Sequence, residues 1–302
     1  MNVIETQALG RRFGRVEAVR DVTLAVPAGT VFALLGPNGA GKTTTIKMLM
    51  NLVAPTSGSA TVLGVDSRRL GVAEFQRIGY VSENQDLPDW MTPSELLAYC
   101  RPFYPSWDEA LASRLQAALA LRSSGPLRSQ SRGTRMKAAL LSSLAYRPEL
   151  IVLDEPFSGL DPVVRDELVR ALLEVPDERP WTVFVSSHDV DEVERLADTV
   201  GFMLDGRLVL AERVDALLAR YRLVEVVWPG DVPPRVDAAA DGWQPQGSSG
   251  RTVRFVDTRH ERPDAMERIT AHFPGASVQV LPMTLRDILV SLAKRPLHPE
   301  AV

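Results

Sequence analysis

The sequence predicts an α/β fold with a mostly parallel sheet, and three features of the chain lead to this fold class. Short runs of β-forming residues alternate along the chain with segments of helical periodicity. Some runs, such as LIVL at 150–153, are apolar at every position, which is typical of strands buried on both faces. A glycine-rich loop follows another such run, VFALL at 31–35, and leads directly into a helical pattern. Strands that alternate with helices in this way form a parallel sheet with both faces covered.

The length and composition limit the classes of protein to consider. With 302 residues, the chain can form one large domain and a smaller module. Its 34 Lys and Arg residues against 38 Asp and Glu residues give a net charge of −4, which argues against a broadly basic surface and predicts no nucleic-acid partner. The lone cysteine, Cys100, cannot form an internal disulfide and indicates a reducing compartment. No apolar run approaches the ~18 residues of a membrane span, and the start lacks the apolar region of a signal peptide. We therefore expect a cytosolic chain that reaches a membrane only through a partner.

The elements of the first two thirds of the chain follow from the same patterns. Strands are predicted at Val31–Leu35, Ser59–Leu63, Ile78–Val81, Leu150–Leu153 and Trp181–Ser186. Helices are predicted in IKMLMNLV after the glycine-rich loop, through a region from about Thr92 to Arg147, and at Val163–Leu173 and Val190–Leu196. Val200–Leu204 and Arg207–Leu210 flank Asp205-Gly206, which predicts a hairpin.

The pattern changes after about residue 220. Loops are predicted over Val227–Gly250, strands at Arg251–Val256 and Ala276–Leu281, and helices at Glu261–Phe273 and Thr284–Lys294. We therefore predict a main domain over residues 1–220, with a helical subdomain at about 92–147, and a small α+β accessory domain over 221–302. The accessory domain carries no ligand motif, so its role is either packing and dimer support or ligand sensing.

The glycine-rich loop is the strongest functional signal, and it matches the phosphate-binding loop. It consists of Gly36, Pro37, Asn38, Gly39, Ala40, Gly41, Lys42, Thr43 and Thr44. Its glycines let successive backbone N–H groups converge on phosphate oxygens, and the following helix presents its positive N-terminal end to the same anion. Lys42 reaches the β- and γ-phosphates, and the Thr43 hydroxyl ligates Mg²⁺. A glycine-rich turn without a ligand is the alternative, which the placement between a strand and a helix disfavours.

Acidic side chains end the buried strand at 150–153, and a histidine follows a later strand. Asp154 at the strand tip suits the Mg²⁺ ion held by Thr43, and Glu155 is placed to polarise an attacking water. A strand-end cap is the alternative for these carboxylates, but the phosphate loop upstream favours the functional interpretation. His188 follows the strand that ends at residue 186, so its imidazole either reaches a γ-phosphate or has only a structural role.

With these motifs in this order, residues ~2–217 resemble the ATP-binding subunits of ABC transporters. GPNGAGKTTT is similar to the family's phosphate loop, LIVLDEP to its acidic strand, Ser158-Gly159-Leu160-Asp161 to its D-loop, and Ser187-His188-Asp189 to its switch-histidine region. The resemblance implies a P-loop NTPase core of the ABC ATPase type, with catalytic roles for Lys42, Glu155 and His188 and a nucleotide-binding role for Asp161. It also implies that Phe13 stacks on adenine, for which a core phenylalanine is the alternative.

Two motifs depart from the family pattern. The signature Leu-Ser-Gly-Gly-Gln is present as Gln130-Ser131-Arg132-Gly133-Thr134, which keeps the Ser and the second Gly. In the family these residues hold a γ-phosphate across a dimer interface, so the resemblance assigns that role to Ser131 and Gly133. At the Q-loop, Glu83 replaces the usual glutamine and is expected to bind Mg²⁺ or its water. We also expect one of the carboxylates of Glu83 and Glu155 to raise the pKa of the other.

The function that the resemblance implies is ATP hydrolysis that energises a transporter. A head-to-tail dimer, in the simplest case a homodimer, would hold ATP and Mg²⁺ at each interface, and its motion would drive an integral membrane subunit. The chain would then lie peripherally at the cytoplasmic face of the cell membrane. Similarity to drug, bacteriocin and lipid exporter subunits favours export. The alternative is a soluble ABC-type ATPase in DNA repair or translation, but the chain has a single phosphate loop and no long coiled coil.

The segment Asn84–Met91 is predicted to contact the membrane subunit. It joins the Q-loop position, which touches the nucleotide, to the helical region, so nucleotide state can there become displacement of a partner. Leu87, Trp90 and Met91 offer apolar anchors, and Asp86 and Asp89 form a charged rim. The alternative is a surface loop whose Trp90 packs on its own domain.

Overall fold

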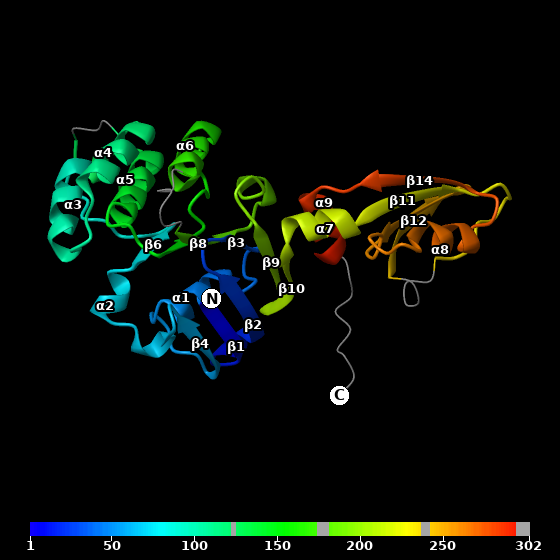
Figure 1. Ribbon diagram of the computed structural model, residues 1–302, viewed down its shortest axis with the longest axis horizontal. Coiled ribbons are helices and arrows are strands. Elements are labelled where there is room, and N and C mark those ends of the chain that lie inside the picture. The colour runs from blue at the N-terminus through cyan, green and yellow to red at the C-terminus, as the bar shows by residue number, and fades with distance from the viewer. Residues whose placement is uncertain (122–124, 174–180, 237–241, 294–302) are drawn as a thin grey trace. The chain divides into compact units, whose positions relative to one another are not determined.

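The computed structural model describes residues 1–121, 125–173, 181–236 and 242–293, and these residues fall into two compact units (Figure 1). The first unit extends from Met1 to Ala211, and the second begins at Glu212. The sequence places the boundary near residue 220, but α7 (Val214–Arg220) contacts α9 (Leu285–Ala293) and belongs to the second unit. Among the described residues, no helix is long and apolar enough to cross a membrane.

A mostly parallel sheet with the strand order β10-β9-β3-β8-β7-β6 forms the core of the first unit. Its strands are β3 (Val31–Leu35), β6 (Ile78–Ser82), β7 (Leu150–Asp154), β8 (Thr182–Ser187), β9 (Thr199–Leu204) and β10 (Arg207–Arg213). Every residue of β7 and β8 is buried, as expected for strands covered on both faces. Asp205 and Gly206 connect β9 to β10 with positive φ angles at both positions, which suits a two-residue hairpin turn. The predicted α/β class and the predicted hairpin are therefore confirmed.

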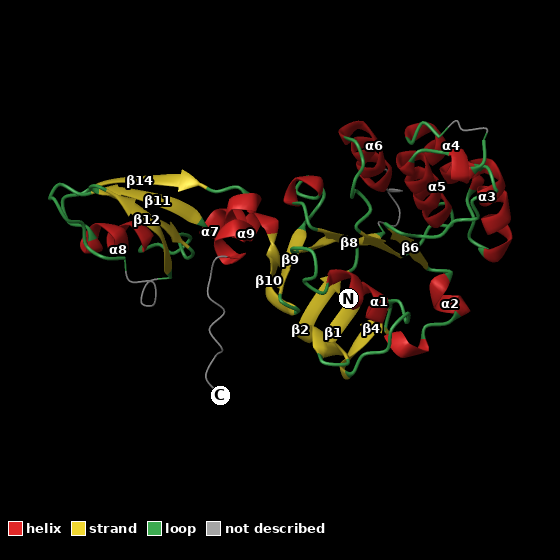
Figure 2. Ribbon diagram, turned by 180° about the vertical axis from the view of Figure 1, so that it is seen from behind, coloured by secondary structure: helices red, strands yellow, loops and turns green. Residues whose placement is uncertain are grey.

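The N-terminal strands form a separate antiparallel sheet with the order β2-β1-β4-β5. Its strands are β1 (Asn2–Phe13), β2 (Val16–Pro27), β4 (Ser57–Val62) and β5 (Val65–Asp66). The sequence patterns predict only β4 among them. From Val22 onward β2 alternates strictly between buried and exposed positions, because only one of its faces is covered. Helix α1 (Lys42–Leu49) contacts β2 and β4 of this sheet and also β7 of the parallel sheet, and thereby joins the two (Figure 2).

The helical subdomain consists of α3 (Pro93–Cys100), α4 (Glu109–Ala118) and α5 (Arg132–Leu144), and α4 and α5 also contact α6 (Pro162–Leu173) (Figure 2). Side chains define where these helices begin: Thr92 forms a capping box with Glu95, and Asp108 accepts a hydrogen bond from the Leu111 N–H. The shorter elements are α2 (Val72–Phe75), η1 (Ser67–Arg69), η2 (Arg101–Phe103), η3 (Leu127–Ser129) and η4 (Val190–Glu192).

The helix predicted over Val190–Leu196 is wrong, because only the 3₁₀ turn η4 forms there. The carboxylate of Asp189 accepts a hydrogen bond from the Asp191 N–H, and the hydroxyl of Ser187 donates to the carboxylate of Glu192. Local side-chain hydrogen bonds of this kind compete with the regular helical pattern. The consequence is a tight loop directly after β8 in place of a helix.

The second unit contains an antiparallel sheet with the order β12-β13-β11-β14. Its elements besides α7 and α9 are β11 (Arg222–Val227), β12 (Trp243–Ser249), β13 (Thr252–Asp257), α8 (Ala265–His272) and β14 (Ser277–Pro282). The core is a cluster of buried apolar residues: Val224, Val226, Trp243, Val253, Phe255, Ile269 and Phe273.

The sequence interpretation of this unit is partly wrong. Loops are predicted over Val227–Gly250, yet β12 is an edge strand that pairs with β13 alone, a position that tolerates its proline and glycine. Trp243 anchors that strand in the core, where it is 1% exposed. Residues 237–241 of the predicted loops and Lys294 at the end of the last predicted helix lie outside the described residues.

Candidate active site

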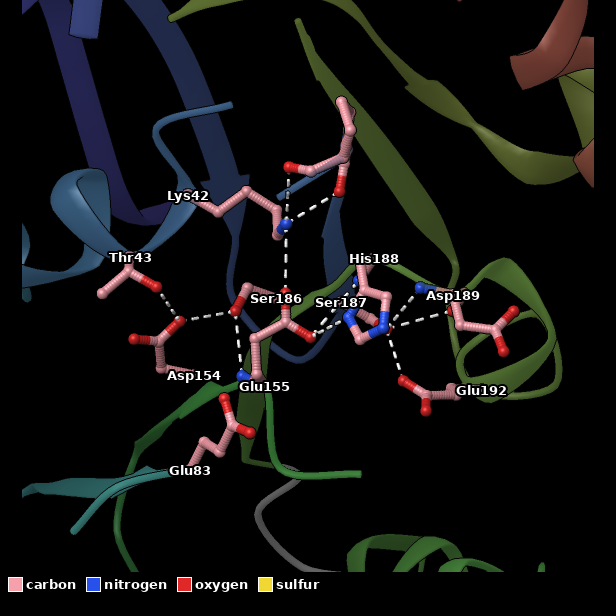
Figure 3. A network of polar contacts seen from close by, with 12 residues as sticks. Lys42, Thr43, Glu83, Asp154, Glu155, Ser186, Ser187, His188, Asp189 and Glu192 are labelled. Atoms are coloured by element: carbon pink, nitrogen blue, oxygen red, sulfur yellow. Dashed lines mark hydrogen bonds and ion pairs between the residues drawn. The ribbon is translucent and has the colours of Figure 1, made fainter. Parts of the chain in front are cut away.

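The carboxyl ends of the parallel strands bring the predicted site residues together (Figure 3). Strand β6 ends beside Asp154 of β7, and Asp154 in turn pairs with Ser186 of β8. Glu83, Glu155 and His188 follow these strand ends directly or after one residue, so they emerge at one edge of the sheet. The phosphate loop follows β3 at the same edge, because β3 pairs in parallel with β8. Ligand sites of open α/β sheets form at this edge.

Glycines shape the phosphate loop at positions where a side chain would collide with the backbone. Gly41, directly before α1, has a φ of 102°, and a Cβ there would lie 2.5 Å from the carbonyl oxygen of Ala18. A Cβ on Gly36 would lie 2.3 Å from the carbonyl oxygen of Met203. Residues 37–39 at the tip of the loop are exposed. The loop thus combines the backbone conformation and the solvent access that phosphate binding needs.

Lys42, Glu155 and His188 form a continuous chain of polar contacts. The Nζ of Lys42 donates to the carbonyl oxygens of Gly36 at 2.7 Å and Pro37 at 3.2 Å, and lies 3.0 Å from Oε1 of Glu155. The other carboxylate oxygen of Glu155 lies 2.8 Å from Nδ1 of His188 and accepts from the His188 backbone N–H at 3.3 Å. The side chains of Lys42 and Glu155 are 5% and 10% exposed, so the pair is screened from bulk water.

The backbone of Glu155 is held in an uncommon conformation. Its φ is 53°, in the left-handed region, which costs a residue with a side chain about 1 kcal/mol. The Glu155 N–H donates to the hydroxyl of Ser186 at 3.0 Å and fixes this turn to β8. The strained turn directs the Glu155 side chain toward Lys42 and His188.

The metal side of the site is formed by Thr43 and Asp154. The hydroxyls of Thr43 and Ser186 donate to Oδ1 of Asp154 at 3.0 and 2.7 Å. Burial raises the pKa of Asp154, although the hydrogen bonds from Ser186 and Thr43 act in the opposite direction. In the described part of the chain, no group of three or more His, Cys, Asp or Glu side chains is placed to hold a metal ion. A hydroxyl and a carboxylate still fit Mg²⁺, which binds through few protein oxygens and completes its shell with phosphate and water.

Glu83 is bonded to the helical subdomain. Its Oε1 lies 2.6 Å from Nη2 of Arg132, the first residue of α5, and its N–H donates to the Asp154 carbonyl oxygen at 2.9 Å. Burial acts to raise the pKa of Glu83, but hydrogen bonds from Arg132 and Ser158 outweigh it, so this pKa lies below its usual value. The expectation that a neighbouring carboxylate raises the pKa is therefore wrong for Glu83.

The remaining predicted residues lie outside the network of Lys42, Glu155 and His188. Asp161 accepts from the N–H groups of Val163 and Val164 and so starts α6, and Ser131 caps α5 by accepting from the Thr134 N–H at 3.1 Å. Gly133 allows close packing, since a Cβ there would lie 3.0 Å from Val164. Intrachain capping and packing thus account for the local positions of these residues.

Phe13 ends β1 and is 45% exposed, with the guanidinium of Arg11 4.4 Å above its ring. The alternative interpretation as a core phenylalanine is therefore wrong. An exposed aromatic face that already attracts a cation is suited to stacking on a planar base. Adenine stacking by Phe13 stays a prediction.

Three side chains hold the site in place without having been assigned that role from the sequence. Ser186 connects Asp154 to the backbone of Glu155, and Glu192 accepts from Ser187, the residue before His188. Arg132 pairs with Glu83. Two of them left a signal in the sequence: Arg132 departs from the family signature, and Ser186 ends a predicted strand that pairs in register with Asp154.

Comparisons with known proteins match this chain to ATP-binding proteins of the ABC transporter family. The model of the ABC transporter family matches residues 19–158. The bacitracin transport ATP-binding protein BcrA of Enterococcus faecalis is 30% identical over 222 residues, which span 73% of this chain and 72% of that protein. The lantibiotic transport ATP-binding protein SrtF of Streptococcus pyogenes is 32% identical over 215 residues, 70% of this chain and 92% of that protein.

A solved structure of the ATP-binding subunit of an ABC transporter is similar as well. It is 27% identical, has a TM-score of 0.64, and the match covers 71% of this chain and 91% of that one. The family match over residues 19–158 includes the phosphate loop, Glu83, Asp154 and Glu155. The family match ends before Asp161 and His188.

Proposed function

The chain belongs to the ABC transporter family of ATP-binding proteins, and on that premise we propose that it energises transport through a separate integral membrane subunit. Members of this family bind ATP and hydrolyse it, and this chain is an ATPase of that kind. The observation that carries the proposal is the contact chain from Lys42 through Glu155 to His188 at the phosphate loop. A cation at the phosphate loop and a carboxylate that can accept a proton from water are groups that phosphoryl transfer to water uses, and His188 holds that carboxylate.

The proposed roles of these residues follow from their contacts. Lys42 exchanges its bonds to the Gly36 and Pro37 carbonyl oxygens for the β- and γ-phosphates of ATP. Once the Lys42 ammonium group has moved to the phosphates, Oε1 of Glu155 is free of that ion pair and accepts a proton from the attacking water. His188 holds the other carboxylate oxygen and so fixes the direction of the base. Thr43, Asp154 and Glu83 would hold Mg²⁺, which would neutralise charge on the phosphates.

We further propose that two copies of the chain complete each site as a head-to-tail homodimer. Ser131 lies exposed at the start of α5 with Gly133 two residues on, a position from which hydroxyl and backbone N–H groups can bind an anion. Asp161 at the start of α6 belongs to the same proposed interface. Phe13 of the chain that carries the phosphate loop would stack on the adenine.

The experiment that tests this function is Glu155→Gln. The amide keeps the size and one hydrogen-bond acceptor but cannot take a proton, so ATP binding should persist while turnover falls by about 10²-fold or more. Size-exclusion chromatography with ATP should show a trapped dimer. Lys42→Ala is the matched comparison, because it should weaken nucleotide binding itself. Hydrolysis at the parental rate by Glu155→Gln would refute the assignment of the base.

The membrane subunit is proposed to dock at the segment Asn84–Met91. Trp90 is 66% exposed, so it does not pack on its own domain as the alternative requires. The first half of the segment lines a cavity of about 380 Å³ with polar and apolar walls, whose lining residues are Ser82, Glu83, Asn84, Gln85, Asp86, Leu87, Arg132, Arg135, Met136 and Ala139. Trp90→Ala should preserve ATP binding and weaken co-purification with the membrane subunit. Phe103→Ala, which removes another exposed aromatic outside the segment, is the control. Unchanged co-purification of Trp90→Ala would remove this segment from the interface.

Peripheral membrane location follows from such docking. Export is the direction we propose, and two relatives named for bacitracin transport and lantibiotic transport support it. The second unit is proposed as an accessory domain that supports packing or the dimer. Fractionation of cells with and without the membrane subunit tests the location: the chain should move to the soluble fraction when its partner is missing.

A further inference from the structure

The two side chains that depart from the family pattern contact each other in this chain. Glu83 stands where the family has glutamine, and Arg132 stands where it has the first glycine of the signature. Nη2 of Arg132 lies 2.6 Å from Oε1 of Glu83. Glutamine and glycine could not form an ion pair, so this contact exists only because both positions differ. Either change alone would add an unpaired charge at this position, whereas together they are neutral.

The contact joins parts of the fold that are distant in sequence. Glu83 is attached to β7, since its N–H donates to the Asp154 carbonyl oxygen at 2.9 Å. Arg132 begins α5 and follows its cap, Ser131. The guanidinium also borders the D-loop, where a Cβ on Gly159 would lie 3.2 Å from Nη1 of Arg132. A displacement of the Arg132 side chain therefore changes contacts with Glu83 on the metal side, at the start of α5 and with Gly159 in the D-loop.

We propose that Arg132 and Glu83 form a nucleotide-sensitive latch in which Glu83 alternates between two partners. With no nucleotide added, Glu83 pairs with Arg132 and holds α5 to the end of β6. With ATP and Mg²⁺ present, the Glu83 carboxylate turns to the metal side, and Arg132 with the start of α5 is released. This inference rests on the proposed role of Glu83 toward Mg²⁺, and it makes both residues positioning residues for the signature segment.

The physical basis is competition for one carboxylate. A ligand that needs Glu83 must first open its pair with Arg132, so its apparent affinity is reduced by the stability of that pair. The side chains of Arg132 and Glu83 are 46% and 30% exposed, so solvent screens the pair. A partly exposed pair shifts a binding equilibrium roughly twofold to fivefold. ATP binding without Mg²⁺ does not involve Glu83 and should be unaffected.

The experiment measures ATP affinity of the full chain by titration calorimetry, with Mg²⁺ and with EDTA. Four proteins are compared: the parent, Arg132→Ala, Glu83→Gln and the double variant. Arg132→Ala should tighten Mg²⁺-dependent ATP binding by about twofold to fivefold and leave binding in EDTA unchanged. In the Glu83→Gln background the same Arg132 change should have no effect, because the competing pair is already absent.

Arg135→Ala is the matched control. Arg135 lines the same cavity one turn further along α5 and, among the described residues, forms no ion pair with Glu83. Arg135→Ala should not change the difference between the ATP affinities measured with Mg²⁺ and with EDTA. An equal effect of both arginine variants would mean that only the general positive charge matters, which would overturn the latch.

A second measurement needs no nucleotide. The thermal unfolding midpoints of the same four proteins should be non-additive, with the double variant no less stable than the less stable single variant. If the midpoints are non-additive but Arg132→Ala leaves the Mg²⁺-dependent ATP affinity unchanged, the pair is purely structural. That result would overturn the latch and leave the proposed function standing. A parent chain that binds ATP equally with and without Mg²⁺ would overturn the proposed metal role of Glu83 and the latch with it.

Discussion

Ser186→Ala is expected to damage the site more than any single hydrogen bond suggests. The Ser186 hydroxyl is completely buried, donates to Oδ1 of Asp154 at 2.7 Å and accepts from the Glu155 N–H at 3.0 Å. Alanine removes both bonds. The Glu155 N–H then has no partner, and Asp154 keeps only the hydroxyl of Thr43 among these donors.

The size of the effect follows from these contacts. A buried donor without a partner costs about 1–3 kcal/mol, and a lost hydrogen bond to a carboxylate about 1.5–3 kcal/mol. We therefore expect the free energy of unfolding to fall by about 3 kcal/mol, which lowers the unfolding midpoint of a unit of this size by about 6–12 °C. The pKa of Asp154, already raised by burial, should rise further. A carboxyl group whose pKa is raised in the folded state contributes stability below its unfolded pKa of about 4, and this contribution is lost as pH rises through the folded pKa. Ser186→Ala should therefore lower the free energy of unfolding more at pH 8 than at pH 4.5.

The assay is thermal unfolding of the full chain followed by circular dichroism at both pH values. Ser142→Ala is the control, because Ser142 is also buried but its hydroxyl donates only to the Ala139 carbonyl oxygen within α5. That variant should stay within about 0.5 kcal/mol of the parent. If Ser186→Ala unfolded within 2 °C of Ser142→Ala (about 0.7 kcal/mol), the bridge between Asp154 and Glu155 would have no energetic importance and the reasoning would fail.

Two further predictions concern the loops around the site. Gly41→Ala should lower the free energy of unfolding by about 3 kcal/mol and weaken ATP binding severely, because the new Cβ would collide with the Ala18 carbonyl oxygen. Gly39→Ala should lower the free energy of unfolding by only about 1 kcal/mol, because Gly39 has a φ of 82° but open space around its Cβ position. Calorimetry of both variants decides, and equal losses would contradict the steric argument. Glu192→Gln should become more stable relative to the parent as pH rises from 4 to 8, by about 1.4 kcal/mol for each unit of pKa shift, because burial raises the pKa of Glu192. Urea unfolding at several pH values measures this, and a relative stability that falls with pH would refute it.

The features that sequence patterns predicted are those encoded by neighbouring residues. The phosphate loop needs glycines at fixed offsets ahead of Lys42, and the acidic strand needs an apolar run that ends in Asp154 and Glu155. Both are contiguous, so local chemistry is sufficient to find them. His188 was also found, because parallel strands end at the same edge of their sheet.

The features that were missed depend on contacts between distant residues. Arg132 and Glu83 are individually visible as departures from a pattern, but their contact requires the packing of α5 against the end of β6. Strands β1 and β2 were missed because β1 and the first half of β2 alternate irregularly, with register shifts in their pairing. Strand β12 has the composition of a loop and is a strand only because β13 lies beside it.

The in-register row of Ser82, Asp154 and Ser186 makes the active site intolerant of changes in strand length. One residue inserted into β8 before Ser186 would turn the Ser186 side chain to the opposite face of the sheet, since side chains alternate with a period of two. It would also move His188 by one residue relative to the ends of the neighbouring strands. An insertion at the other end of the same strands, near Glu149, would leave the row intact. In the evolution or engineering of this protein, added residues should therefore accumulate at the amino ends of the parallel strands, while β6, β7 and β8 keep their lengths at the carboxyl edge.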